Sequence, residues 1–84
     1  MTEGFGGLVT TSDGTPVKGV KIQIYDSSGK LLATVYTDED GWYMYNYKWT
    51  GKAATFTIKL PAYNLKQSVT LKANAFAFVN FTVP

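Results

Sequence analysis

The sequence predicts an all-β domain, built as a β-sandwich of seven short antiparallel strands in two sheets. Apolar residues recur with a period of two, and Gly, Asp, Asn or Pro interrupts this alternation about every eight to twelve residues. The 84 residues are 45% hydrophobic and 17% charged, a balance typical of a small globular protein. We therefore expect residues 1–84 to form a single domain, excised from a larger protein.

The first four strands are expected at residues 4–11, 20–25, 31–37 and 42–49. Phe5, Gly7 and Val9 share one face of the first strand, and Val20, Ile22 and Ile24 share one face of the second. In the third strand, alternation groups the inward candidates as Leu31, Ala33, Val35 and Thr37. The segments SDGTPVKG, DSSG and DEDG separate these strands and have the composition of tight turns.

Three further strands complete the predicted sandwich. The fifth places Phe56, Ile58 and Leu60 on one face and ends at Pro61, which cannot donate to a strand ladder. The sixth and seventh are expected near 67–72 and 76–83. In the seventh, one face carries Ala77, Val79, Phe81 and Val83. Seven strands at this spacing in one domain favour two packed sheets.

The sequence resembles the transthyretin-like (prealbumin-like) β-sandwich family, which includes carboxypeptidase regulatory-like domains and the B-type repeats of surface adhesins. The resemblance covers about the first 45 residues and depends on this ordered set: Gly7-x-Val9, Asp13-Gly14-x-Pro16-Val17-x-Gly19-Val20, Ile22-x-Ile24-x-Asp26, Gly29, and Thr37-Asp38-x-x-Gly41-x-Tyr43-x-Tyr45. It implies a seven-stranded Greek-key sandwich that serves as an accessory or stalk module of an extracellular or cell-surface protein.

Composition argues against several classes of function. The chain has no His, Cys or Arg, so the usual general base, thiol nucleophile and anion clamp are missing, and we expect no enzyme. Eight scattered Lys residues and a net charge of +2 do not indicate nucleic-acid binding. No apolar run is long enough for a membrane helix. An isopeptide cross-link is not expected, because residues 5–11 contain no Lys and Asn80 should point outward.

Carboxylates in two turns are candidate ligands for a calcium ion. Asp38 and Asp40 flank Glu39 in one turn, and Asp26 opens the preceding one. Calcium takes six to eight oxygen ligands, so side chains from adjacent loops could begin a site. The alternative is that these carboxylates only cap their own turns. No other cofactor is indicated.

The stretch WYMYNYKW is unusually rich in aromatic residues. Alternation sends Tyr43, Tyr45, Tyr47 and Trp49 inward as core filling, and leaves Trp42 and Met44 outward with Asn46 and Lys48. Tyr25 and Tyr36 also fall on outer faces of their strands. If those strands lie near the fourth, the predicted binding surface comprises Trp42, Met44, Tyr25 and Tyr36. Large exposed aromatic side chains at one place are typical of a contact surface.

These observations favour a structural or interaction module, a spacer or docking domain of a larger secreted or cell-surface prokaryotic protein. Its partners would be neighbouring domains of the same chain or another protein. The alternative is a carbohydrate-binding module in which Trp42 with Tyr25 or Tyr36 stacks on sugar rings. Assembly by edge-strand addition is a third hypothesis, although we expect a monomer.

Overall fold

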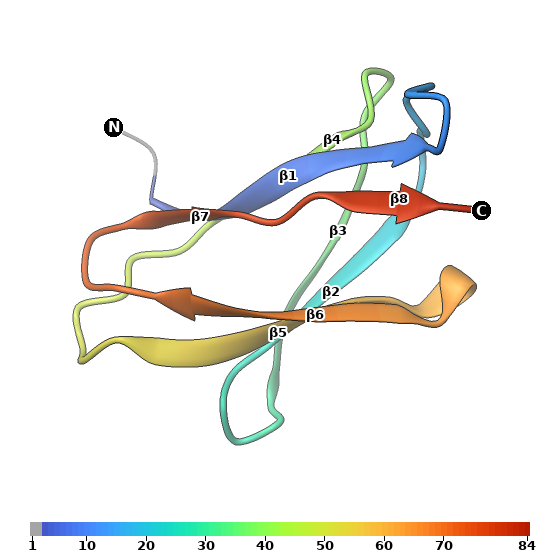
Figure 1. Ribbon diagram of the computed structural model, residues 1–84. Helices are drawn as coiled ribbons and strands as arrows, with labels where there is room; N and C mark the ends of the chain where they lie inside the picture. Colours follow the sequence, from blue (N-terminus) through green and yellow to red (C-terminus); the bar gives the residue numbers. More distant parts are fainter. Residues whose placement is uncertain (1–2) are drawn as a thin grey trace.

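The computed structural model describes residues 3–84, which fold into two packed β-sheets (Figure 1). The strands are β1 (Gly4–Thr11), β2 (Lys21–Tyr25), β3 (Leu31–Tyr36), β4 (Trp42–Asn46), β5 (Ala54–Leu60), β6 (Leu65–Leu71), β7 (Phe76–Phe78) and β8 (Phe81–Val83). A single turn of 3₁₀-helix, η1 (Pro61–Tyr63), links β5 to β6. Within residues 3–84, no helix has the length and apolar character needed to span a membrane.

One sheet has the order β4-β1-β7, with β8 also paired to β1, and the other has the order β3-β2-β5-β6. The prediction of a two-sheet sandwich is therefore confirmed. The prediction that all pairing is antiparallel is wrong, because β1 pairs in parallel with both β7 and β8. This pairing arises because the chain returns to the first sheet after β6 and runs alongside β1 in the same direction (Figure 1).

The predicted seventh strand is two strands, so the structure has eight. Residues 79–80 separate β7 from β8, yet they stay bound to β1. The Val79 amide donates to the Gly6 carbonyl oxygen at 2.9 Å, and the Leu8 amide donates to Oδ1 of Asn80 at 2.8 Å. A side-chain acceptor therefore replaces a backbone acceptor at this point, which interrupts the ladder without leaving an amide unpaired.

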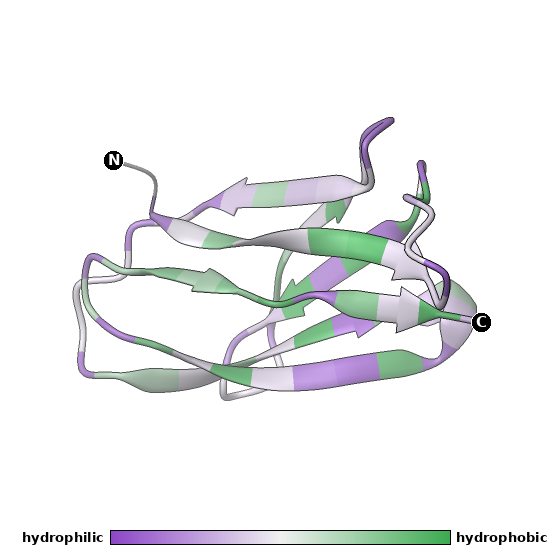
Figure 2. Ribbon diagram, turned by 45° about the horizontal axis from the view of Figure 1, so that its top comes forward, coloured by the Kyte–Doolittle hydropathy of each residue, from purple (hydrophilic) through white to green (hydrophobic). Residues whose placement is uncertain are grey.

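The core lies between the sheets and follows the predicted alternation, visible as alternating hydropathy along the strands in Figure 2. The inward faces predicted for the first, second, fifth and seventh strands are confirmed. The buried apolar side chains are Phe5, Val9, Val20, Ile22, Ile24, Tyr43, Phe56, Ile58, Leu60, Leu71, Ala77, Val79, Phe81 and Val83.

A β-bulge changes the alternation at the start of β3. The register shifts between Ile24 and Tyr25, so that Ile24 faces Ala33 but Tyr25 faces Leu31. Leu32 packs against the core, and Leu31 is exposed. The grouping of Leu31 with Ala33 and Val35 was therefore wrong, because an extra residue in one strand reverses the side to which the following side chains point.

Candidate functional site

An apolar groove crosses the outer face of the β4-β1-β7 sheet. It has a volume of about 410 Å³. We call it the aromatic groove and define it by its lining residues: Gly6, Gly7, Trp42, Tyr43, Met44, Phe76 and Phe78. Among the hollows on the described surface, this one has an almost wholly apolar lining, which makes it the strongest candidate for a contact site.

Strand register explains how the groove forms. Gly6 of β1 lies opposite Met44 on one side and Phe78 on the other, so it forms the floor between two walls of large side chains. A Cβ atom at Gly6 would lie 2.7 Å from the ring of Phe76. Glycine therefore allows the Phe76 ring to lie against the β1 backbone, and any other residue would push this ring away.

The walls of the groove expose large apolar side chains to solvent. Phe78 is 67% exposed, Met44 54% and Trp42 44%. Phe78 meets the rings of Trp42 and Phe76 edge to face, with centroid separations of 6.4 and 4.9 Å. Single exposed hydrophobic residues are common on protein surfaces. Rings in mutual contact form one continuous apolar surface, which is typical of an interaction site.

The groove contains no charged side chain, and the one hydroxyl among its lining residues, that of Tyr43, points away from it. The Tyr43 hydroxyl points into the core, where it donates to the Val79 carbonyl oxygen at 2.6 Å. Burial raises the pKa of this phenol above its ordinary value. The Tyr43 side chain is therefore part of the core and offers no polar group to the groove. Such a lining can bury apolar groups of a partner but offers few partners for hydrogen bonds.

The predicted patch is only partly assembled. Trp42 and Met44 lie in the groove, and Tyr36 borders them across an adjoining hollow that also includes Asp38. Tyr25 lies elsewhere, on the other sheet, where its ring faces the Lys59 ammonium at 4.7 Å from the centroid. The patch of four was therefore wrong in including Tyr25, because β2 lies inside the β3-β2-β5-β6 sheet, whereas its edge strand β3, which carries Tyr36, contacts β4.

Sequence reasoning missed Phe76 and Phe78. The signal was present, since the inward positions Ala77 and Val79 imply outward positions for the residues between them. The sequence did not show the strand order. In the structure, the glycine-rich β1 lies between β4 and β7 and pairs with both. Pairing of distant segments brings these phenylalanines to Trp42.

The inward half of the aromatic stretch packs against the core, in agreement with its alternation. Tyr43 is fully buried, whereas Tyr45, Tyr47 and Trp49 are half-buried and stack in sequence, with centroid separations of 5.5 and 6.4 Å. Phe56 meets Tyr47 and Trp49 edge to face. This ladder packs against the core, as the alternation predicts.

The structure does not assemble the predicted calcium site. Asp26 lies in the β2–β3 turn, whereas Asp38 and Asp40 lie in the β3–β4 turn, at the other end of β3. Six residues of strand separate the turns by roughly 20 Å. Within residues 3–84, no three acidic side chains are grouped closely enough to hold a metal ion.

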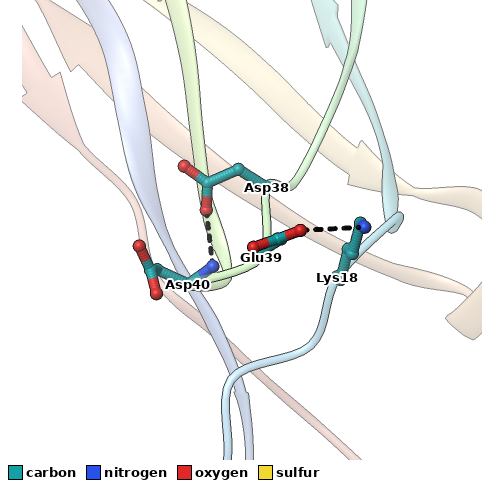
Figure 3. Close-up of polar contacts among 4 residues, drawn as sticks. All are labelled: Lys18, Asp38, Glu39 and Asp40. Carbon is teal, nitrogen blue, oxygen red and sulfur yellow. Dashed lines mark hydrogen bonds and ion pairs between the residues drawn. The ribbon is translucent and has the colours of Figure 1, made fainter.

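The carboxylates of Asp26 and Asp38 act within their own turns. Oδ1 of Asp38 accepts from the amides of Asp40 and Trp42, and Glu39 forms an exposed ion pair with Lys18 at 3.4 Å (Figure 3). Asp26 accepts from the hydroxyl and amide of Ser28 and from the amide of Lys30. The Ser28 hydroxyl bond, followed by the Lys30 amide bond, holds the pKa of Asp26 below its ordinary value.

We predict that calcium leaves the domain unchanged. Thermal unfolding in millimolar CaCl₂ and in excess EDTA, at equal ionic strength, should give the same midpoint within error, because the carboxylates that could bind the ion lie at opposite ends of a strand. A midpoint that rises with calcium and is restored by EDTA would contradict this geometry.

Comparisons with known proteins identify the fold. No family model matches the chain, and no curated protein is similar to it in sequence. Among solved structures, the Bacillus anthracis TIE protein matches with a TM-score of 0.70 at 17% identity, over 96% of this chain and 17% of that chain. The Klebsiella pneumoniae 5-hydroxyisourate hydrolase matches with a TM-score of 0.71 at 14% identity, over 99% and 90% of the two chains.

Both neighbours are members of the transthyretin-like fold. This chain has the transthyretin-like fold. The family resemblance inferred from the first 45 residues therefore holds at the level of fold, and at these identities the likeness extends no further. The chain corresponds to about a sixth of the TIE protein, which carries this fold within a longer chain.

The hydrolase corrects one of our predictions. We expected this chain not to be an enzyme, partly because the family resemblance implied an accessory or stalk module. A neighbour with the same transthyretin-like fold is named as a hydrolase, which contradicts that expectation. The fold is therefore no ground for excluding catalysis, and fold and function have to be argued separately.

Proposed function

We propose that this chain is an interaction domain whose aromatic groove docks an apolar surface of a neighbouring domain in a larger secreted or cell-surface prokaryotic protein. In this proposal the chain is a carboxypeptidase regulatory-like domain or a B-type repeat. The observation that supports it is the exposure of Trp42, Met44 and Phe78 side by side in a groove without charged groups. Burial of such a surface by a partner would be favourable by about 25 cal/mol for each Å² of apolar area.

A neighbouring domain is the occupant that the comparisons support best. In the TIE protein, the matching fold makes up 17% of the chain, so a domain of this kind is found among other segments. Domains joined in one chain meet at high effective concentration, and a modest groove is sufficient for docking under that condition.

A specific observation favours a second candidate, binding of carbohydrate. Tyr36 and Trp42 border a hollow that also includes Asp38, which combines aromatic surface with a carboxylate acceptor. The groove itself suits sugars less well. Its rings meet edge to face, and its lining contains no carboxylate, amide or ammonium side chain that could bond to sugar hydroxyl groups. The two candidates share Trp42 but differ in Phe78, which lines only the groove, and Tyr36, which lines only the adjoining hollow.

The docking proposal is tested by titrating the chain with separately expressed segments that flank it in its gene, using NMR or calorimetry. Phe78→Ser should weaken binding by roughly 10- to 30-fold, because it removes a ring at the centre of the contact. Leu31→Ser is the matched control, since Leu31 is equally apolar and 44% exposed but lies on the other sheet. Equal losses for the two variants, or no binding by any flanking segment, would refute docking at the groove.

The carbohydrate candidate is tested by gel retardation on a panel of polysaccharides. If it is correct, Tyr36→Ala and Trp42→Ala should abolish retardation, and Phe78→Ser should preserve it. Absence of retardation on the whole panel would exclude it. Trp42, Tyr43 and Met44 line both hollows, but Phe78 lines only the groove and Tyr36 only the adjoining hollow. The Phe78 and Tyr36 variants therefore distinguish failure of one candidate from failure of the other.

A further inference from the structure

A second, basic hollow lies on the other sheet. It is formed where β2, β5 and β6 meet the η1 turn, and it has a volume of about 380 Å³. Its polar side chains are Gln23, Lys59, Asn64 and Lys66, and we call these four residues the basic hollow. None of its lining residues is acidic. It is separate from the aromatic groove, which lies on the β4-β1-β7 sheet.

Two like charges face each other in this hollow. Lys59 of β5 and Lys66 of β6 are direct cross-strand partners. Side chains in such positions have Cβ atoms about 5 Å apart, and like charges there destabilise a sheet. Neither ammonium is paired with a carboxylate among residues 3–84, where the ion pair formed is that of Lys18 with Glu39. The arrangement therefore lacks a counter-charge.

Tyr25 contacts the side chains of both Lys59 and Gln23. Its ring contacts the Lys59 ammonium at 4.7 Å from the centroid, and its hydroxyl donates to Oε1 of Gln23 at 3.3 Å. Because the Gln23 oxygen is occupied, its Nε2 group is left to donate to a ligand. The hollow thus presents two ammonium groups and an amide donor.

The acidic residue of an adjoining hollow does not supply the counter-charge. Asp26 lies in an adjoining hollow that also contains Tyr25, Lys59 and Lys66. Its carboxylate accepts hydrogen bonds from Ser28 and Lys30 within its own turn, as described above. Its charge moderates the positive potential there, and it forms no ion pair with either lysine among the described residues.

We propose that the basic hollow binds a tetrahedral oxyanion, a phosphate or sulfate group. Lysine binds such groups as a point charge, and one oxyanion with several acceptor oxygens can contact both ammonium groups and the Gln23 amide together. Binding would replace the repulsion between Lys59 and Lys66 with two attractive contacts. The alternative is a purely structural role, in which Lys66 only discourages pairing of the edge strand β6 with another chain.

The first test is thermal unfolding in sodium phosphate, sodium sulfate and sodium chloride at equal ionic strength. At a concentration of about five times the dissociation constant, the bound oxyanion should raise the midpoint by about 4–8 °C over chloride. The phosphate and sulfate series together show which group the hollow prefers. Equal midpoints in all three salts would overturn the proposal.

Lys66→Gln and Lys48→Gln form a matched pair of variants, since each removes one exposed positive charge and Lys48 lies outside the hollow. In chloride, Lys66→Gln should raise the midpoint by about 1–5 °C, because it removes the repulsion with Lys59. It should lose the response to oxyanions, whereas Lys48→Gln should keep it. An equal response in both variants would mean general ion effects and would refute the site.

A second measurement does not depend on stability. Phosphate titration followed by NMR should shift the Gln23 side-chain amide signals along a saturable curve in the wild type and leave them unchanged in Lys66→Gln. A linear, unsaturated shift in both proteins would also refute the site.

Discussion

Gly7→Ala is expected to destabilise the domain by about 3 kcal/mol or more, which is a large part of the stability of an 84-residue protein. A Cβ atom at this position would lie 2.0 Å from the Val79 carbonyl oxygen and 2.7 Å from its carbonyl carbon. Backbone atoms cannot move away as a flexible side chain can. The β7–β8 segment would therefore have to separate from β1. Urea unfolding followed by far-UV circular dichroism measures the loss.

Gly29→Ala is the control for this substitution. A Cβ atom at Gly29 meets nothing within 4 Å, but its φ of +86° disfavours any residue with a side chain. We expect a cost of about 1–2 kcal/mol from backbone strain alone. If Gly7→Ala were as stable as Gly29→Ala, the close approach of Val79 to β1 would be wrong.

The local features of this fold could be predicted from sequence because they depend on neighbouring residues. Alternation placed Ile22 and Ile24, and later Val79 and Phe81, on buried faces, and the structure agrees. Turn composition located the turn before β4, where Asp38 caps the chain. Period-two patterns and turn chemistry act within a few residues, so one sequence is sufficient to read them.

The composition of the candidate site could not be predicted in the same way. Tyr25 and Tyr36 have the same outward parity, yet only Tyr36 borders Trp42, because it lies on β3 next to the edge of the other sheet. Phe78 reaches Trp42 only because β1 pairs in parallel with β7. Which strands become neighbours depends on the packing of the whole chain, and alternation contains no information about it.

The two sheets present chemically opposite outer faces. The face of the β4-β1-β7 sheet carries Trp42 and Phe78 around a glycine floor, whereas that of the other sheet carries Lys59 and Lys66. Together, the two proposals assign an apolar partner to one side of the domain and an anionic group to the other. The aromatic groove and the basic hollow share no lining residue, so the effects of Phe78→Ser and Lys66→Gln on stability and binding should be additive.

Tyr43→Phe is expected to lower the free energy of unfolding by about 1–2 kcal/mol at neutral pH, since it leaves the buried Val79 carbonyl oxygen without its hydroxyl donor. At alkaline pH the order of the two proteins should reverse. Burial raises the pKa of the Tyr43 phenol in the folded state above the value of about 10 that it has in the unfolded chain. Above pH 10 the unfolded state therefore loses this proton while the folded state keeps it.

The wild type then loses about 1.4 kcal/mol of stability for each pH unit, and the stability from this group is fully present only below pH 10. Tyr43→Phe has no such proton, so its profile lacks this slope, and the two curves cross. Urea unfolding at intervals from neutral pH to about pH 11.5, where the loss reaches about 2 kcal/mol, measures both curves and their crossing. Tyr36→Phe serves as the control for removal of an exposed tyrosine hydroxyl. Parallel curves for the wild type and Tyr43→Phe would show that this hydroxyl does not titrate differently in the two states.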